Sequence, residues 1–262
     1  MTTGNGNKLK KLLEVHTPGT VCLASWLEAQ GLSHDLQKHY RRSGWLESIG
    51  RGAFKRPGDT VGWEGALYAL QKQAGMRVHV GGRTALTKQG SNQYIRLGGD
   101  KVYLYSPLGE KLPPWFSNYQ WGVQIEHVKT AFLPVELGVG EVEDMGYGSP
   151  VSPFNLRISD AERAIMECLY LTPRKQGLVE VYEMMEGLVN LRPKVVQQLL
   201  EQCSSVKVKR LFLFMAAKIS HKWLQFLDMS KINLGKGDRS IVPNGVYVSK
   251  FRISVPRELV DK

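Results

Sequence analysis

Residues 20–56 carry the pattern that most restricts the fold: two short helices joined by a glycine, then two short strands. Apolar residues at helical spacing predict a helix over Val21–Gln30. Gly31 suits the position after a helix end, where a positive φ is usual. Ser33 is a typical N-cap for a following helix that ends near Ser43. Two short helices connected by a tight turn form a helix-turn-helix.

The helix that begins after Ser33 has a polar and basic face. Leu36 and Tyr40 lie four residues apart and predict its buried side. In the major groove, Arg and Lys side chains pair with guanine, and Gln side chains pair with adenine. We therefore expect this helix to contact double-stranded DNA through Ser33, His34, Gln37, Lys38, Arg41 and Arg42.

The residues after this helix predict a β-hairpin. Trp45–Ile49 alternates as a strand, Gly-Arg-Gly at 50–52 makes a turn, and Ala53–Arg56 returns as a second strand. A hairpin in this place is the wing of a winged helix. We expect Arg51 at its tip to reach a minor groove or a phosphate, and Lys55 and Arg56 to reach the DNA backbone. The alternative is a winged helix that mediates only protein contacts.

The rest of the chain mixes strands and helices, so we expect an α+β protein with two domains. An N-terminal winged helix-turn-helix would occupy residues 1–62, and a larger mixed α/β domain residues 63–262. The pattern predicts helices over Trp63–Gln73, 159–171 (opened by a capping box at Ser159), Leu178–Gly187, Pro193–Cys203 and Val206–Lys218. It predicts strands over Met76–Val80, Tyr94–Leu97, Val102–Tyr105 and Gly122–Lys129, an irregular connection over Leu133–Pro153, and a hairpin turn at Asn244-Gly245.

The charge of the chain favours an acidic partner. Its formal net charge is +11, and the surplus lies at the two ends: +4 over residues 1–62, +1 over 63–157 and +6 over 158–262. The longest apolar run, Leu211–Ala217, is too short to cross a membrane. The three cysteines are far apart and form no C-x-x-C pair, and residues 1–7 are not a signal peptide. We expect a soluble cytoplasmic protein with no membrane contact.

A second basic surface is suggested near the C-terminus. On a helix that continues past Ser220, four basic side chains fall within one sector, namely Lys207, Arg210, Lys218 and Lys222. The ordinary explanation is a solvated helix face, and the alternative is a second surface for nucleic acid or a partner.

No recognisable active site is present. The sequence contains no Walker loop, H-E-x-x-H or G-x-S-x-G motif. The best catalytic candidate is Glu126 with Lys129, in the range of Asp100 and Glu136. Metal-dependent nucleases use carboxylates and a lysine. Residues three apart on a strand point to opposite faces, which argues against that chemistry. We expect no enzyme, no catalytic residue, no metal site and no cofactor, with a nuclease-like C-terminal domain kept as the alternative.

Five blocks of the sequence are distinctive, and together they span nearly the whole chain: GLSHDLQKHYRRSGWLESIGRGAFKRPGD (31–59), VHVGGRTALTKQG (78–90), RISDAERAIMECLYL (157–171), LRPKVVQQLLEQCSSVKVKRLFLFMA (191–216) and NGVYVSKF (244–251). They resemble the AbiEi-type antitoxins, the regulatory halves of bacterial type IV toxin–antitoxin pairs, which are often encoded at phage-defence loci.

The resemblance implies a function for each domain. The N-terminal winged helix would bind inverted repeats in the promoter of its own operon, as a monomer or weak dimer that pairs on the DNA, and repress transcription. By this similarity DNA contact would fall on Gln37, Lys38, Arg41, Arg42 and Arg51. The C-terminal domain would counter a nucleotidyltransferase-like toxin. The type IV label implies that direct binding to the toxin is not required.

Overall fold

The computed structural model describes residues 3–90, 101–144 and 154–261. The described chain divides into two compact units. The first comprises residues 1–79, 109–125 and 141–157, and the second comprises residues 80–108, 126–140 and 158–262. The predicted domain boundary at residue 62 falls inside the first unit. Tyr94–Leu97, predicted as a strand, lies outside the described residues.

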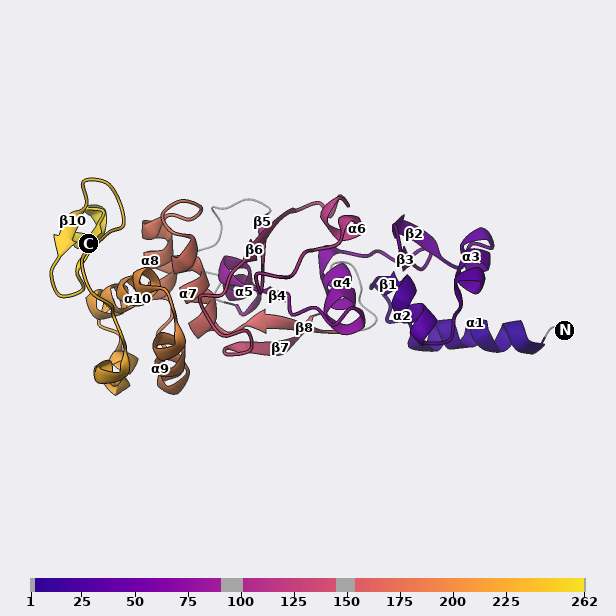
Figure 1. The fold of residues 1–262 in the computed structure, drawn as a ribbon, viewed down its shortest axis with the longest axis horizontal. Helices are drawn as coiled ribbons and strands as arrows, with labels where there is room; N and C mark the ends of the chain where they lie inside the picture. The colour runs from indigo at the N-terminus through magenta and orange to yellow at the C-terminus, as the bar shows by residue number, and fades with distance from the viewer. Residues whose placement is uncertain (1–2, 91–100, 145–153, 262) are drawn as a thin grey trace. The chain divides into compact units, whose positions relative to one another are not determined.

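The first unit begins with a winged helix-turn-helix (Figure 1). Its elements are α1 (Thr3–Val15), β1 (Cys22–Leu23), α2 (Ala24–Ala29), α3 (His34–Arg42), β2 (Glu47–Gly50) and β3 (Ala53–Lys55). The three strands form an antiparallel sheet in the order β1-β3-β2. Gly31 adopts a φ of 84° between α2 and α3, so the predicted glycine turn is confirmed.

One detail of the predicted helix-turn-helix is wrong. The helix expected over Val21–Gln30 starts only at Ala24, because Cys22 and Leu23 form a strand that pairs with β3. The core beneath the three helices and the wing is apolar and contains Leu12, Cys22, Leu27, Leu32, Tyr40, Leu46 and Phe54. Full burial of such a side chain contributes about 1.5–3 kcal/mol.

The helix after the wing packs directly against the winged helix. It consists of α4 (Trp63–Tyr68) and a π-helical turn, η1 (Ala69–Gln73). Gln73 lies alongside β1: its amide nitrogen donates to the Val21 carbonyl at 2.8 Å, and its amide oxygen accepts from the Leu23 N–H at 2.8 Å. Gln73 thus pairs with backbone groups that a neighbouring strand would otherwise satisfy.

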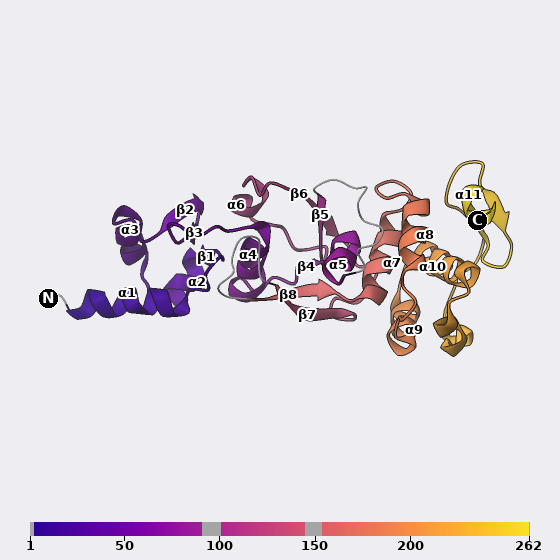
Figure 2. The same ribbon diagram turned by 180° about the vertical axis from the view of Figure 1, so that it is seen from behind.

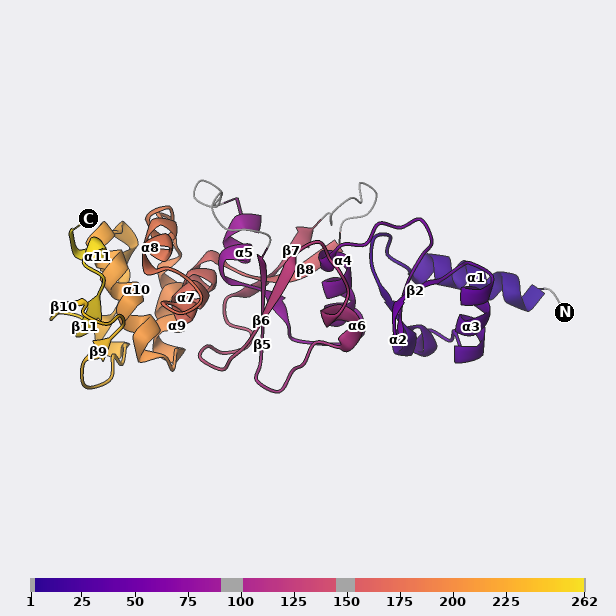
Figure 3. The ribbon, with the colours of Figure 1, turned by 90° about the horizontal axis from the view of Figure 1, so that it is seen from above.

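A five-stranded sheet has the order β6-β5-β4-β8-β7, and Figure 3 shows β5 beside β6 and β7 beside β8. Its strands are β4 (His79–Val80), β5 (Lys101–Ser106), β6 (Gln124–Lys129), β7 (Val139–Asp144) and β8 (Phe154–Ser159). β4 and β8 are parallel. The irregular connection predicted over Leu133–Pro153 is wrong for Val139–Asp144, where Gly and acidic residues form a strand at the end of the sheet order.

The second unit is mainly helical beyond the sheet (Figure 2). Its helices are α5 (Gly82–Lys88), α7 (Ala161–Leu171), α8 (Leu178–Glu186), α9 (Pro193–Gln202), α10 (Val206–Ile219), η3 (Lys222–Phe226), η4 (Met229–Lys231) and α11 (Glu258–Asp261). α7 is the central element, since it contacts α5, α8, α9 and α10. Asp160 caps α7 by accepting from the Arg163 N–H at 3.1 Å, so the cap is one residue later than the predicted Ser159.

The C-terminal segment forms a small sheet in the order β10-β11-β9. Its strands are β9 (Arg239–Ser240), β10 (Val246–Val248) and β11 (Ile253–Val255). The hairpin between β10 and β11 turns through residues 249–252, not at Asn244-Gly245 as predicted. The Asn-Gly turn instead precedes β10, and β9 pairs with β11 in parallel.

Candidate nucleic-acid interface

The orientation of α3 is held by a buried amide. Gln37 is 2 % exposed, and its Nε2 donates to the carbonyls of Ala24 at 3.0 Å and Leu32 at 2.8 Å. These carbonyls belong to the start of α2 and to the turn between the two helices. The prediction that Gln37 contacts a base is therefore wrong: its side chain is buried, and its Nε2 connects α3 with α2 and the turn between them.

Three other side chains of α3 are exposed and basic. Lys38 and Arg42 are exposed and make no ion pair among the described residues. Arg41 is also exposed, with its guanidinium carbon 5.5 Å from the centre of the Phe54 ring of β3. This cation–π contact restrains the long Arg41 side chain but does not pair its charge with an anion. Three of the predicted cations thus remain available to an anionic ligand.

The start of α3 is polar. Ser33 is at the N-cap position and exposed, but its hydroxyl does not cap the helix. His34 is exposed, with its Nε2 3.2 Å from Glu28 Oε2. Because both side chains of this pair are more than half exposed, their attraction is screened by solvent and weak. His34 and Ser33 are therefore accessible at the end of α3 that precedes the cationic residues.

The three predicted cations of the wing differ in exposure: Arg51 is exposed, whereas Lys55 and Arg56 are partly buried. Arg51 at the tip is exposed and has no ion-pair partner in the described chain. Lys55 is less available, because its Nζ lies 3.5 Å from Glu47 and 3.3 Å from the Asp59 carbonyl, with 19 % of the side chain exposed. Arg56 is half-buried. The geometry therefore favours Arg51 over Lys55 as the wing residue that can reach a ligand.

The predicted second basic surface is wrong. Arg210 is 1 % exposed, and its guanidinium donates to the carbonyls of Leu234, Gly235, Gly237 and Arg252 at 2.7–3.1 Å. The helix α10 is buried on several sides because it contacts both α7 and α8.

The other members of this sector are also mostly occupied. Lys207 donates to the carbonyls of Tyr170 at 2.8 Å and Thr172 at 2.5 Å. Lys218 is half-buried and donates to the Val260 carbonyl at 2.9 Å. Lys222 alone of the four predicted residues is exposed. These cations stabilise backbone turns of the second unit and do not form a shared ligand surface.

The nuclease alternative gains no geometric support. Glu126 pairs with Lys175, Lys129 is exposed, and Asp100 lies outside the described residues. In the part of the chain that the structure describes, no three His, Cys, Asp or Glu side chains are grouped to hold a metal ion.

Ser106 and the three cysteines are buried. Ser106 Oγ lies 2.8 Å from His127 Nε2, but Ser106 is only 3 % exposed and out of reach of a substrate. Burial raises the pKa of the Cys22 thiol to about 12 and that of Cys203 to about 11, and it also raises the pKa of Cys168. Each thiol is therefore protonated and unreactive near neutral pH.

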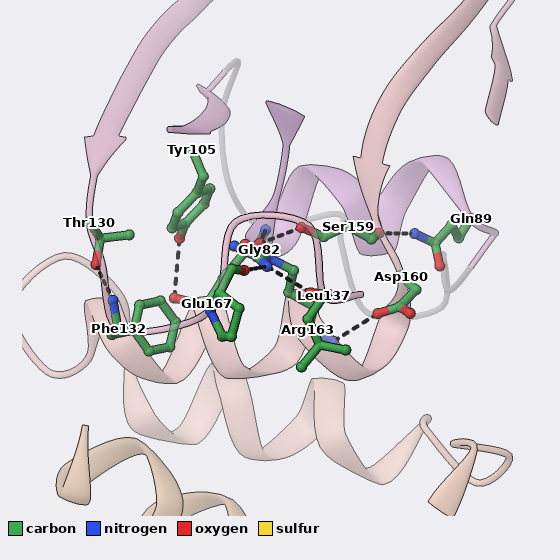
Figure 4. Close-up of polar contacts among 11 residues, drawn as sticks. Gly82, Gln89, Tyr105, Thr130, Phe132, Leu137, Ser159, Asp160, Arg163 and Glu167 are labelled. Atoms are coloured by element: carbon green, nitrogen blue, oxygen red, sulfur yellow. Dashed lines mark hydrogen bonds and ion pairs between the residues drawn. The ribbon is translucent and has the colours of Figure 1, made fainter. Parts of the chain in front are cut away.

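Sequence reasoning missed a buried ion pair in the second unit, shown in Figure 4. Arg163 Nε donates to Glu167 Oε1 at 2.7 Å, and both side chains are almost completely buried. Glu167 Oε2 accepts from the Gly82 N–H and the Ser159 hydroxyl, each at 2.8 Å. The spacing of Arg163 and Glu167, four apart on one helix, is the signal that could have indicated the pair.

This ion pair connects α7 with three other segments. Arg163 Nη1 donates to the carbonyls of Pro134 and Leu137, while Glu167 reaches the α5 N-terminus and the end of β8. A Cβ at Gly81 would lie 2.3 Å from Glu167 Oε2, so only glycine fits there. Arg163 and Glu167 are buried and hydrogen-bonded to neighbouring segments, which indicates a structural role for the pair.

Two family models together match nearly the whole chain. A family model described as transcriptional regulator, AbiEi antitoxin, type IV toxin–antitoxin system matches residues 99–256, and the model of the AbiEi antitoxin N-terminal domain matches residues 5–97. The chain belongs to the AbiEi antitoxin family. It is thus a transcriptional regulator and an antitoxin of a type IV system, and neither description names an enzyme class.

One solved structure has a fold similar to that of this chain. The crystal structure of the RV2827C protein from Mycobacterium tuberculosis matches with a TM-score of 0.59 at 11 % identity, covering 100 % of this chain and 96 % of that chain. At this identity the similarity supports the fold alone. A search of curated proteins gave no significant match. Among the described residues of this AbiEi antitoxin, no helix has the length and apolar character needed to span a bilayer.

Proposed function

We propose that this AbiEi antitoxin represses its own operon by binding inverted repeats in the promoter through α3 and the wing. The proposal rests on three exposed cations of α3 and the wing tip that have no ion-pair partner among the described residues, namely Lys38, Arg42 and Arg51. Arg41 adds a fourth exposed cation, and its guanidinium lies over the Phe54 ring. Cations without an internal partner can neutralise DNA phosphates and release counterions without first breaking an ion pair. The buried Gln37 supports the interface from inside and makes no base contact.

We further propose that residues after about 62 carry the activity that counters a nucleotidyltransferase-like toxin. Support comes from the C-terminal family model, which begins at residue 99. The protein is proposed to act in the cytoplasm as a monomer or weak dimer that pairs on the two half-sites.

The test is a titration of the DNA upstream of the gene with purified full-length protein at several salt concentrations. Binding should weaken steeply with salt, and Lys38→Ala or Arg41→Ala should each cost about 1–3 kcal/mol of binding free energy if the residue contacts a base. A suitable control is Lys194→Ala, which removes another exposed lysine, from α9 of the second unit. Salt-independent binding, or equal losses in all three variants, would contradict recognition through α3 and favour a winged helix that binds proteins.

A further inference from the structure

The backbone of the wing lies directly against a helix that is distant in sequence: Gly50 contacts Trp115, which follows it by 65 residues. A Cβ added to Gly50, the last residue of β2, would lie 2.6 Å from the Cβ and 3.1 Å from the Cα of Trp115. Real Cβ atoms do not approach so closely, so a glycine at this position is a requirement of the contact. Trp115 belongs to α6 (Pro114–Ser117), and it is 8 % exposed.

The short helix α6 is held rigidly by its own aromatic neighbours. The rings of Trp115 and Phe116 meet edge to face with centroids 5.7 Å apart, and Phe116 is completely buried. Trp121 packs 5.5 Å from Phe116, and its indole N–H donates to the Phe116 carbonyl at 2.7 Å. Pro114 starts the helix, where its fixed φ is favourable. Gly50 therefore lies against a helix that is fixed by its own packing.

The other side of the wing tip is also anchored. The register of β2 and β3 shifts between Ser48 and Gly50, and Gly52 adopts a φ of 76°. The Gly52 carbonyl accepts from the Ala24 N–H at 2.9 Å, at the start of α2. Arg51 is therefore the exposed residue of a tip whose flanking glycines contact α6 on one side and α2 on the other. Its backbone position depends on both contacts.

We propose that Trp115 is a positioning residue for DNA binding: α6 sets the angle of the wing so that Arg51 reaches the duplex. This inference rests on the proposed function and extends it. It assigns part of the connection between β5 and β6, residues 107–123, to the DNA-binding module, although the sequence predicts these residues in the second domain. The wing would then not be complete in residues 1–62 alone.

The test compares Gly50→Ala with Gly109→Ala in the full-length protein. Gly109 also lies in the first unit, but a Cβ there would meet nothing within 4 Å, so it is the matched control. For each variant, and for Arg51→Ala, the affinity for the upstream DNA is measured over a range of salt concentrations. Removing one phosphate contact lowers the slope of log affinity against log salt by about 1.

We expect Gly50→Ala to lower the slope as Arg51→Ala does, and Gly109→Ala to keep the slope of the original protein. The double variant Gly50→Ala/Arg51→Ala should bind like Arg51→Ala, because a displaced wing has already lost this contact. Trp115→Gly, which removes the Cβ that faces Gly50 and adds no atom to the wing, should give the same reduced slope. A melting experiment on each variant separates this effect from loss of folding.

Fully additive losses in the double variant, or an unchanged slope in folded Gly50→Ala and Trp115→Gly, would overturn the positioning role of α6. That outcome is distinguishable from failure of the proposed function itself. If the original protein binds DNA independently of salt, or if Lys38→Ala and Arg41→Ala bind normally, the recognition surface is wrong whatever the wing variants show.

Discussion

At the scale of single residues, a buried amide and an exposed amine in consecutive positions of α3 have opposite roles. Gln37→Ala leaves two carbonyls without their donor, so we expect the free energy of unfolding to fall by about 1–3 kcal/mol. Lys38→Ala removes an exposed side chain and should leave stability almost unchanged while weakening DNA binding. Urea unfolding and DNA titration of both variants test this pair. Equal stability of the two variants would contradict the role assigned to Gln37.

The single residue His16 should make the stability of the first unit sensitive to acid. Burial lowers the pKa of this imidazole below its ordinary value of 6.5, against the opposing effect of Asp59, whose carboxylate lies 3.6 Å away. Above pH 6.5 the ring is neutral in both the folded and unfolded chain, so it makes no difference. Below this pH the unfolded chain binds a proton first, and the free energy of unfolding decreases.

The measurement for His16 is the urea midpoint at pH 7.5 and at pH 5.5. Other groups also titrate in this interval, so the comparison is between the original protein and His16→Gln, which should lose less stability on acidification. His34→Gln provides the control, because its side chain is 67 % exposed. A loss on acidification in His16→Gln as large as in the original protein would show that this histidine does not contribute.

At the scale of elements, α7 depends on the ion pair of Arg163 and Glu167. Glu167→Gln keeps the shape of the side chain but leaves a buried guanidinium without its counter-charge, and breaking such a pair costs about 3–5 kcal/mol. Glu186→Gln, at the exposed end of α8, is a control that should have little effect. Chemical unfolding followed by circular dichroism measures both. A change in the Glu167 variant no larger than in the control would contradict the central role of this pair.

The sequence predicted the elements of the winged helix because its pattern is local. Gly31, the apolar pair Leu36 and Tyr40, and the strand–turn–strand after Trp45 act within a few residues of each other. The same helical spacing places Gln37 beside Leu36 and three residues before Tyr40, on the buried stripe. The error at Gln37 came from treating a polar residue as exposed, although buried amides are common where backbone carbonyls need donors.

The errors in the C-terminal half have a different physical origin. The burial of Arg210 depends on carbonyls of residues 234–252, and the helix pattern around it carries no information on that distant segment. The strand Val139–Asp144 has acidic residues and glycine, and its place in the sheet depends on pairing with β8. The contact of Gly50 with Trp115 likewise joins distant parts of the sequence. Single-sequence periodicity does not report such long-range partners.

At the scale of the whole molecule, the proposed regulation and antitoxin activities should be separable by surface substitutions. Deleting residues 1–62 is a poor test, because Gln73 hydrogen-bonds to Val21 and Leu23, and the backbone of α4 at Gly65 lies against Gly19. The deletion would expose a packed face of the remaining protein. The double variant Lys38→Ala/Arg41→Ala removes exposed charges and leaves these contacts intact. It should lose repression of a promoter reporter and still rescue growth from the partner toxin.

The reciprocal variant is Glu167→Gln, whose defect lies in the second unit. Because its target is a buried pair remote in sequence from α3, we expect it to impair growth rescue more than DNA binding at a temperature where the first unit stays folded. Reporter activity and growth rescue are measured with both proteins at equal cellular amounts. If folded Lys38→Ala/Arg41→Ala loses growth rescue together with repression, antitoxin activity requires DNA binding. The assignment of the two activities to separate units would then be wrong.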